Sequence, residues 1–184
     1  MQKQIKIKNK NIVYKIRQSQ RAKRMRLAVY CDGAVVVTQP KNVSINTLEY
    51  YIKQKADWLI GKLEFFANLK TTIPPASHQD YLSKKDQVLN LVSVKIEKLN
   101  IIYGFKFHKI NIKNQKTRWG SCSRKCNLNF NYRIIYLPDK VAEYIIAHEL
   151  CHLREFNHSQ KFWNLVSRSM QNYLDLKRSL KMKV

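Results

Sequence analysis

The 184-residue sequence is poor in the two residues that most often interrupt regular structure, with four glycines and four prolines. This composition excludes collagen-like and Gly/Pro-rich low-complexity architectures. No apolar run approaches the roughly 20 residues of a membrane-spanning helix, so we expect no membrane segment. The basic N-terminus is not followed by the apolar stretch of a secretory signal, which favours a cytoplasmic location. Because 45% of the residues are hydrophobic, the chain can nevertheless bury a sizeable core.

Acidic residues are scarce and unevenly distributed. Twelve Asp and Glu stand against 35 Lys and Arg, which gives a formal net charge of +23. No acidic residue precedes Asp32, whereas ten basic residues do: Lys3, Lys6, Lys8, Lys10, Lys15, Arg17, Arg21, Lys23, Arg24 and Arg26. Such a surface attracts polyanions, and a nucleic acid is the partner that it suggests. The joint abundance of Lys, Asn and Ile is also what an AT-biased coding sequence produces, so the charge has a second explanation that requires no function.

Cysteines number four, and with no export signal we expect all of them to be reduced. Cys122 and Cys126 are four residues apart, which is not the C-x-x-C spacing of a metal knuckle. The spacing therefore argues against a metal or redox pair.

The first 75 residues predict a basic module of strands followed by a helix. Apolar and polar residues alternate from Ile5 to Lys8 and from Met25 to Tyr30, as in half-buried strands, and a continuous apolar run covers 34–37. Asp32-Gly33 lies between the last two of these runs and predicts a hairpin turn in which both central residues have positive φ.

A helix follows from about Ser44 to Leu69, where apolar residues recur every three or four positions. Asn46 and Glu49 form a potential capping pair near its start. Pro74-Pro75 interrupts the pattern, which divides the chain into an N-terminal module (1–75) and a second domain (76–184).

The second domain mixes helices with short strands. The pattern predicts a helix over 78–100 that Gly104 ends, strands over 106–113 and 127–136, a short extended segment over 119–122, and helices over 138–156 and 159–180. The first of these helices has an apolar face of Leu82, Leu89, Val92, Ile96 and Leu99. The 127–136 strand places Leu128, Phe130, Tyr132 and Ile134 on one face and Asn129, Asn131 and Arg133 on the other.

The motif that carries chemistry is His148-Glu149-Leu150-Cys151-His152, an H-E-x-x-H on a predicted helix. At about 100° per residue, the two histidines lie about 40° apart on one face and can bind one small cation. Zinc suits neutral imidazole nitrogen. Glu149 adjoins the first ligand, where it can take a proton from a zinc-activated water as the general base.

A catalytic zinc site needs a third protein ligand, and His158 is the candidate. It lies six residues after His152, which is the ligand spacing of metzincin proteases, although Glu155 stands where their motif has glycine. Asn157 is placed to turn the chain back at the end of the helix. The Glu155 carboxylate can accept a ring N–H from a ligand histidine or simply remain exposed, and Cys151 is better explained as a small buried residue than as a fourth ligand.

Several blocks together resemble the YgjP-like metallopeptidase family. They are Arg118-Trp119-Gly120-Ser121-Cys122, Leu128-Asn129, the H-E-L-x-H motif, and Asn157-His158-Ser159 with Phe162 and Trp163. The D-G turn, the V-x-V-T-x-P strand and the Lys55 to Trp58 segment extend the resemblance to nearly the whole chain. It implies a zincin fold related to the SprT-like and WLM-type peptidases, with three histidine ligands matched by His148, His152 and His158 and a general base matched by Glu149. Lys125-Cys126 and Cys151 depart from the family's usual glycine and alanine.

The R-W-G-S-C block has two interpretations. Trp119 can be a buried residue with Gly120 in a tight turn, or the segment can form the edge of a cleft that pairs with an extended substrate. A zincin also needs a second group to stabilise the oxyanion, for which Arg118, His108 and Tyr136 are all candidates. Phe162 and Trp163 are interpreted as core residues that anchor the last helix.

The sequence as a whole predicts an α+β zinc metallopeptidase: a basic β-hairpin and helix module, then a zincin-like catalytic unit with a small antiparallel sheet and an active-site helix. It would hydrolyse a peptide or protein substrate. One alternative is a DNA-associated protease that uses the basic N-terminal surface, and another is a non-enzymatic nucleic-acid binder with a structural zinc. The sequence does not indicate an oligomeric state.

Overall fold

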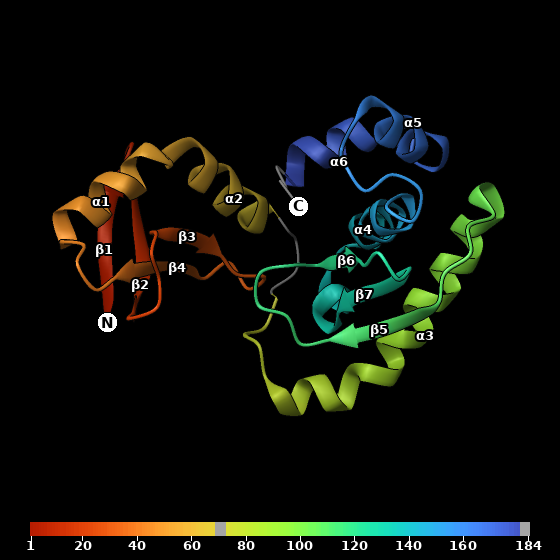
Figure 1. The fold of residues 1–184 in the computed structure, drawn as a ribbon, viewed down its shortest axis with the longest axis horizontal. Helices are drawn as coiled ribbons and strands as arrows, with labels where there is room; N and C mark the ends of the chain where they lie inside the picture. The colour runs from red at the N-terminus through yellow and green to blue at the C-terminus, as the bar shows by residue number, and fades with distance from the viewer. Residues whose placement is uncertain (69–72, 181–184) are drawn as a thin grey trace. The chain divides into compact units, whose positions relative to one another are not determined.

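The computed structural model describes residues 1–68 and 73–180 and forms two compact units, residues 1–68 and 69–184 (Figure 1). The predicted boundary, after Pro75, lies a few residues beyond this division, which follows Asn68. No described helix is both long and apolar enough to cross a membrane. Both units combine helices with a small sheet, which confirms the α+β class.

The first unit is built on a four-stranded sheet in the order β1-β2-β4-β3. Its strands are β1 (Gln2–Ile7), β2 (Lys10–Ser19), β3 (Arg26–Val29) and β4 (Val35–Pro40). β2 runs parallel to β4, and the other neighbours are antiparallel. The strict alternation along β1 and β2 buries every second side chain, as the sequence pattern predicts.

Two helices, α1 (Ile45–Gln54) and α2 (Ala56–Asn68), lie along one side of this sheet (Figure 1). Their apolar side chains complete a core that includes Tyr14, Val37, Leu48 and Leu59. The single helix predicted from Ser44 to Leu69 is therefore wrong, because the chain breaks at Lys55; Leu69 lies outside the described residues. Ser44 caps α1 by accepting a hydrogen bond from the Thr47 N–H, so the predicted capping role of Asn46 is also wrong.

The hairpin between β3 and β4 forms where it was predicted, but with a different turn. Tyr30 N–H donates to Ala34 O across a three-residue loop, and Gly33 N–H donates to Tyr30 O. Gly33 has a φ of +80°, whereas Asp32 does not have a positive φ and instead accepts the Ala34 N–H with its carboxylate. This is the three-residue connection in which one glycine takes the left-handed conformation, rather than the two-residue type I′ turn.

The second unit begins with the long helix α3 (His78–Tyr103), which Gly104 ends with a φ of +63°. The buried face of α3 holds Val88, Val92, Ile96, Leu99 and Tyr103. Leu82 and Leu89, predicted for this face, are exposed. Three strands follow: β5 (Lys109–Lys113), β6 (Gly120–Cys122) and β7 (Asn127–Asn131). Their order is β5-β7-β6, with β5 parallel and β6 antiparallel to β7. This small sheet is therefore mixed and not antiparallel as predicted, and β6 is an edge strand.

The remaining elements are η1, a 3-10 helix (Tyr132–Tyr136), and the helices α4 (Asp139–Cys151), α5 (Gln160–Ser169) and α6 (Tyr173–Leu180). The strand predicted over 127–136 therefore ends at Asn131, and the last predicted helix is two helices. α4 packs between α3, α5 and the edge strand β6. This packing places the H-E-x-x-H segment beside the edge of the sheet.

Candidate metal centre

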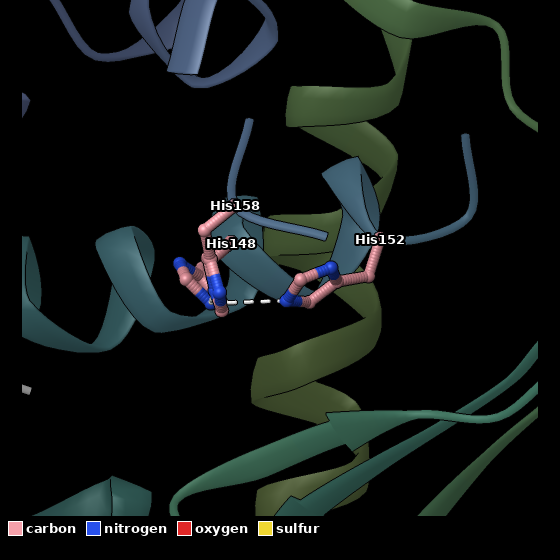
Figure 2. Close-up of side chains that lie close together, drawn as sticks. All are labelled: His148, His152 and His158. Carbon is pink, nitrogen blue, oxygen red and sulfur yellow. Dashed lines mark hydrogen bonds between the residues drawn. The ribbon is translucent and has the colours of Figure 1, made fainter. Parts of the chain in front are cut away.

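Three histidine side chains converge in the second unit, and they are the three that the sequence predicts as ligands (Figure 2). His148 Nε2 lies 3.1 Å from His152 Nε2 and 3.0 Å from His158 Nε2. One nitrogen from each ring lies within 4.8 Å of the others. We call His148, His152 and His158 the histidine cluster.

The end of α4 explains how the cluster forms. His148 lies in the last turn, and His152 is the residue at which the helix ends, so one helical turn aligns the two rings. The helix ends earlier than the predicted Phe156. The chain then turns, and two backbone hydrogen bonds stabilise this turn: the Leu153 N–H donates to Leu150 O, and the Glu155 N–H donates to Cys151 O. Asn157 does not have the predicted left-handed conformation but accepts the Ser159 N–H with its side-chain oxygen, and this bend returns His158 to the other rings.

The His152 ring is oriented by a backbone group. His152 Nδ1 lies 2.9 Å from the Glu155 carbonyl oxygen. Since a carbonyl only accepts, Nδ1 carries the proton and Nε2 presents its lone pair to the cluster. The predicted partner was the Glu155 carboxylate, so the correct residue was identified with the wrong group. Burial lowers the pKa of His152, which favours the neutral, metal-binding form.

His158 is the exposed member of the cluster, and α5 supports it. The Trp163 indole N–H donates to the His158 carbonyl at 3.1 Å. The Trp163 ring stacks on the His158 ring, with centroids 5.7 Å apart, and on Tyr173 at 5.5 Å. Phe162 is fully buried and packs against all three histidine rings. Phe162 is thus a core residue, whereas the partly exposed Trp163 also holds His158 in place.

Glu149 is almost completely buried, with 2% of its surface exposed. Burial raises the pKa of its carboxyl to about 8, although the positive charge of Arg118 and a hydrogen bond from the Cys122 backbone N–H oppose this rise. Its Oε2 atom has no hydrogen-bond partner. Glu149 adjoins His148 in α4, and a buried carboxylate with one unsatisfied oxygen and a raised pKa is a candidate functional group.

Gly120 makes room for this carboxylate. A Cβ atom at position 120 would lie 2.6 Å from Glu149 Cγ and 2.8 Å from Oε1, closer than real Cβ contacts. The glycine of the R-W-G-S-C block is therefore part of β6 and lies against Glu149, so the tight-turn interpretation is wrong. The same interpretation was right about Trp119, which is buried.

A buried polar network, which the sequence analysis did not assign to the site, holds the loop before β6. The Asn131 side-chain amide donates to Gln115 O and Arg118 O, and its oxygen accepts the Arg133 N–H. Arg133 is fully buried and also donates to Gln115 O. Asn129 links the three strands, since it accepts from Asn111 and donates to Ser121 O. The sequence did contain a signal for this network. The strand with Asn129 and Asn131 alternates apolar residues with Asn, whereas the solvated strands of this chain alternate them with Lys.

The three residues predicted as candidates for stabilising the oxyanion differ in their surroundings. Arg118 is exposed and acts electrostatically on Glu149. The Tyr136 hydroxyl donates to the Asp80 carboxylate at 3.0 Å. His108 is exposed at the start of β5, where its backbone N–H donates to Cys126 O. Arg118 is thus the candidate with an interaction that links it to the site.

The cysteines stand apart from the cluster of potential metal ligands among the described residues. Cys151 is fully buried, and burial raises the pKa of its thiol to about 11. Burial and the nearby Glu149 raise the pKa of Cys122 to about 12. Both thiols are therefore protonated at neutral pH, which does not suit a metal ligand.

Comparisons with known proteins identify a metallopeptidase family. A family model described as "YgjP-like, metallopeptidase domain" matches residues 79–183, more than half of the chain. The metallopeptidase zymogen abylysin of Pyrococcus abyssi is 22% identical, with 49% of this chain and 86% of that chain covered and a TM-score of 0.42. The metallopeptidase zymogen jannalysin of Methanocaldococcus jannaschii is 26% identical, with coverages of 51% and 91% and a TM-score of 0.41. A search of curated proteins gives no match.

Proposed function

Since the chain belongs to the YgjP-like metallopeptidase family, we propose that it hydrolyses peptide bonds at the histidine cluster, with zinc as its metal and Glu149 as the general base. Metallopeptidase activity follows from the family. The metal identity, the three ligands and the role of Glu149 are the proposal. The observation that carries it is the convergence of three imidazoles from one helix end and its return loop, with the buried Glu149 next to His148 in the same helix.

The donor set fits zinc. Three imidazole nitrogens leave a fourth position open, which is the composition of a catalytic rather than a closed structural site. Two ligands of a tetrahedral zinc with bonds of about 2.0–2.1 Å lie about 3.3 Å apart. The separations of 3.0 and 3.1 Å at His148 Nε2 are close to that value. The tautomer of His152 supports the same assignment, because its Nε2 faces the other two rings with a lone pair.

Bound zinc supplies a Lewis acid that polarises the scissile carbonyl and lowers the pKa of a water. Glu149 accepts the proton of the attacking water and passes it to the leaving amine. Its pKa of about 8 in the metal-free protein reflects a nearly water-free position in which a carboxylate is a stronger base than in solution. Gly120 and the Cys122 N–H fix this carboxylate against β6.

The edge strand β6 is suited to hold an extended substrate. Asn131 N–H donates to Trp119 O, and Ser123 N–H donates to Asn127 O, so alternate residues of this segment face β7. Gly120 and Cys122 therefore direct their backbone N–H and C=O groups away from β7. The Cys122 N–H serves Glu149, and the other outward groups can pair with a peptide backbone.

The metal assignment is tested by measuring metal content. The purified chain is expected to hold about one zinc, and His148→Ala or His158→Ala should remove most of it. His108→Ala is the control, since it removes an exposed histidine outside the cluster. Full zinc content in His158→Ala would show that the third ligand is wrong.

The role of Glu149 as the general base is tested with two substitutions that each replace a carboxylate by an amide, one at Glu149 and one at Glu155. Glu149→Gln should keep zinc and lower peptide hydrolysis by about 10²–10⁴-fold, because the amide cannot take a proton. Glu155→Gln should change hydrolysis little, because its backbone carbonyl, which contacts His152, is retained. A Glu149→Gln variant with unchanged turnover would refute the mechanism.

A further inference from the structure

The first unit presents a sheet face that no helix of that unit covers. α1 and α2 contribute to a core that takes the inward side chains of the strands, including Ile5, Ile16 and Val37. Residues of the opposite parity point away from this core. Among them Lys6, Lys15, Arg17 and Arg26 are exposed, and none of the residues at such strand positions is acidic. We call this surface the open sheet face.

The charges of this unit are sorted between its two sides. Its four acidic residues are Asp32 in the hairpin turn and Glu49, Asp57 and Glu64 on the helices. Lys8 forms an ion pair with Asp57, and Lys10 pairs with Glu64 at 3.0 Å. Acidic residues thus offset part of the positive charge beside the helices, whereas the open sheet face carries no acidic residue. An AT-biased coding sequence alone would not be expected to keep acidic residues off one face of the sheet.

The basic side chains are also regularly spaced. Arg17 and Arg26 flank Thr38 in register across β4, which separates their Cα atoms by about two strand spacings, roughly 10 Å. Lys15 lies two residues from Arg17 on the same strand, roughly 7 Å away. The exposed Arg21, Lys23 and Arg24 continue the positive charge into the loop between β2 and β3. The result is a two-dimensional array of long cationic side chains.

We propose that the open sheet face binds duplex nucleic acid through its phosphate backbone, without sequence preference. A dense line of phosphates complements such an array, and neutralising phosphates releases bound counterions. The outward strand positions carry no aromatic side chain, so the face lacks the stacking platform on which single strands bind. This inference concerns a surface outside the histidine cluster and does not depend on the proposed catalytic role.

The experiment measures binding of the full chain to a fluorescent duplex of about 25 base pairs over a series of salt concentrations. The triple variant Lys15→Gln/Arg17→Gln/Arg26→Gln should weaken binding at least tenfold at low salt. It should also reduce the slope of log K against log salt by up to about 3, close to 0.9 for each lost phosphate contact. Lys15→Gln and Arg26→Gln alone should each lower the slope by about 1, which keeps the test valid if the triple variant unfolds.

The matched control is Lys41→Gln/Lys53→Gln/Lys55→Gln, which removes the same charge from exposed positions in or beside α1. It should leave the slope nearly unchanged. Equal effects of the two triple variants would show that binding depends only on the net charge of the chain, which would overturn the proposal. No duplex binding at low salt would do the same.

Two further probes test the identity of the partner. A single strand of the same length should bind more weakly than the duplex, and vesicles containing about 30% phosphatidylserine should bind with little difference between the two triple variants. Tighter binding to the single strand would overturn the assignment to duplex. Vesicle binding that depends on Lys15, Arg17 and Arg26, in the absence of duplex binding, would make the face a membrane-binding surface instead.

Discussion

The two units use polar residues in opposite ways. In the first unit, the charged strand residues that point away from the core are exposed, and Gln39 is the one buried polar residue among those described. In the second unit, the residues of the site and their supports are buried: Asn129, Asn131, Arg133, His148, Glu149 and His152.

This difference separates two kinds of function. A solvated charge costs little to keep and gives long-range attraction, whereas a buried polar group needs a partner or costs free energy of unfolding. The second unit meets this requirement for Asn131 and Arg133 with backbone carbonyls, but leaves Glu149 Oε2 without a hydrogen bond. We therefore expect substitutions in the second unit to affect both stability and catalysis, and charge substitutions in the first unit to affect binding alone.

Gly120→Ala should give the largest effect. Its Cβ would overlap Glu149, so the carboxylate must move from its place against β6. A displacement of about 1 Å is enough to lower the rate by about 100-fold, and overpacking should cost about 1–3 kcal/mol of stability. Gly104→Ala is the control: its Cβ meets nothing within 4 Å, but its φ of +63° is strained, so it should cost about 1 kcal/mol and leave turnover unchanged. Equal turnover in both variants would contradict the role given to Gly120.

The convergence of the three histidines could be predicted from sequence because it follows from spacing along one helix and one return loop. His148 and His152 are one turn apart in any α-helix, and few residues separate them from His158. The role of Gly120 could not be predicted, because nothing in the R-W-G-S-C block states that the strand lies against Glu149, almost 30 residues later. That contact depends on how α4 packs against β6.

The fold shows the same division. Strand alternation predicted β1 and β2, but it continued through Tyr132–Tyr136, where the chain forms the 3-10 helix η1. The side chain of Asn131 accepts the Arg133 N–H and so caps η1, a local competition that apolar alternation does not reveal. The burial of Arg133 could not be predicted from the sequence either, because the side chain donates to the carbonyl of Gln115, which lies in another loop.

Two asparagines test the comparison between the units directly. Asn131→Ala removes the donor to Gln115 O and Arg118 O from a buried position, so we expect a loss of about 2–4 kcal/mol in the free energy of unfolding. Asn11→Ala makes the same chemical change at an exposed position of β2 and should stay within about 0.5 kcal/mol. Denaturant titration measures both. Similar losses at the two positions would remove the distinction drawn here.

The pH dependence of stability gives a smaller effect. In the metal-free protein the Glu149 pKa of about 8 lies above its unfolded value of 4.5, so its contribution is fully present below pH 4.5 and is lost as pH rises through 8. Between pH 7 and 8.5 this amounts to about 1 kcal/mol. Lys62 in the first unit, whose pKa burial lowers to about 8, acts in the opposite direction over the same range. The measurement is therefore the difference in unfolding free energy between wild type and Glu149→Gln, which should change by about 1 kcal/mol across this window; a constant difference would show that Glu149 is not buried as described.

The last prediction concerns His158, the exposed histidine of the cluster. His158 is held by Trp163 through the indole N–H and through ring stacking, and these two contributions can be separated. Trp163→Phe keeps an aromatic ring but removes the donor to the His158 carbonyl, so zinc affinity should fall only about three- to tenfold. Trp163→Ala removes both contributions, and its loss should approach the upper part of the 10–100-fold range typical for groups that orient metal ligands. Competition with a zinc chelator measures both affinities. Tyr173→Phe is the control, because it preserves the ring that stacks on Trp163 and should leave zinc affinity unchanged. If Trp163→Ala binds zinc as tightly as wild type, the return loop alone positions His158, and the exposed ligand needs no support from α5.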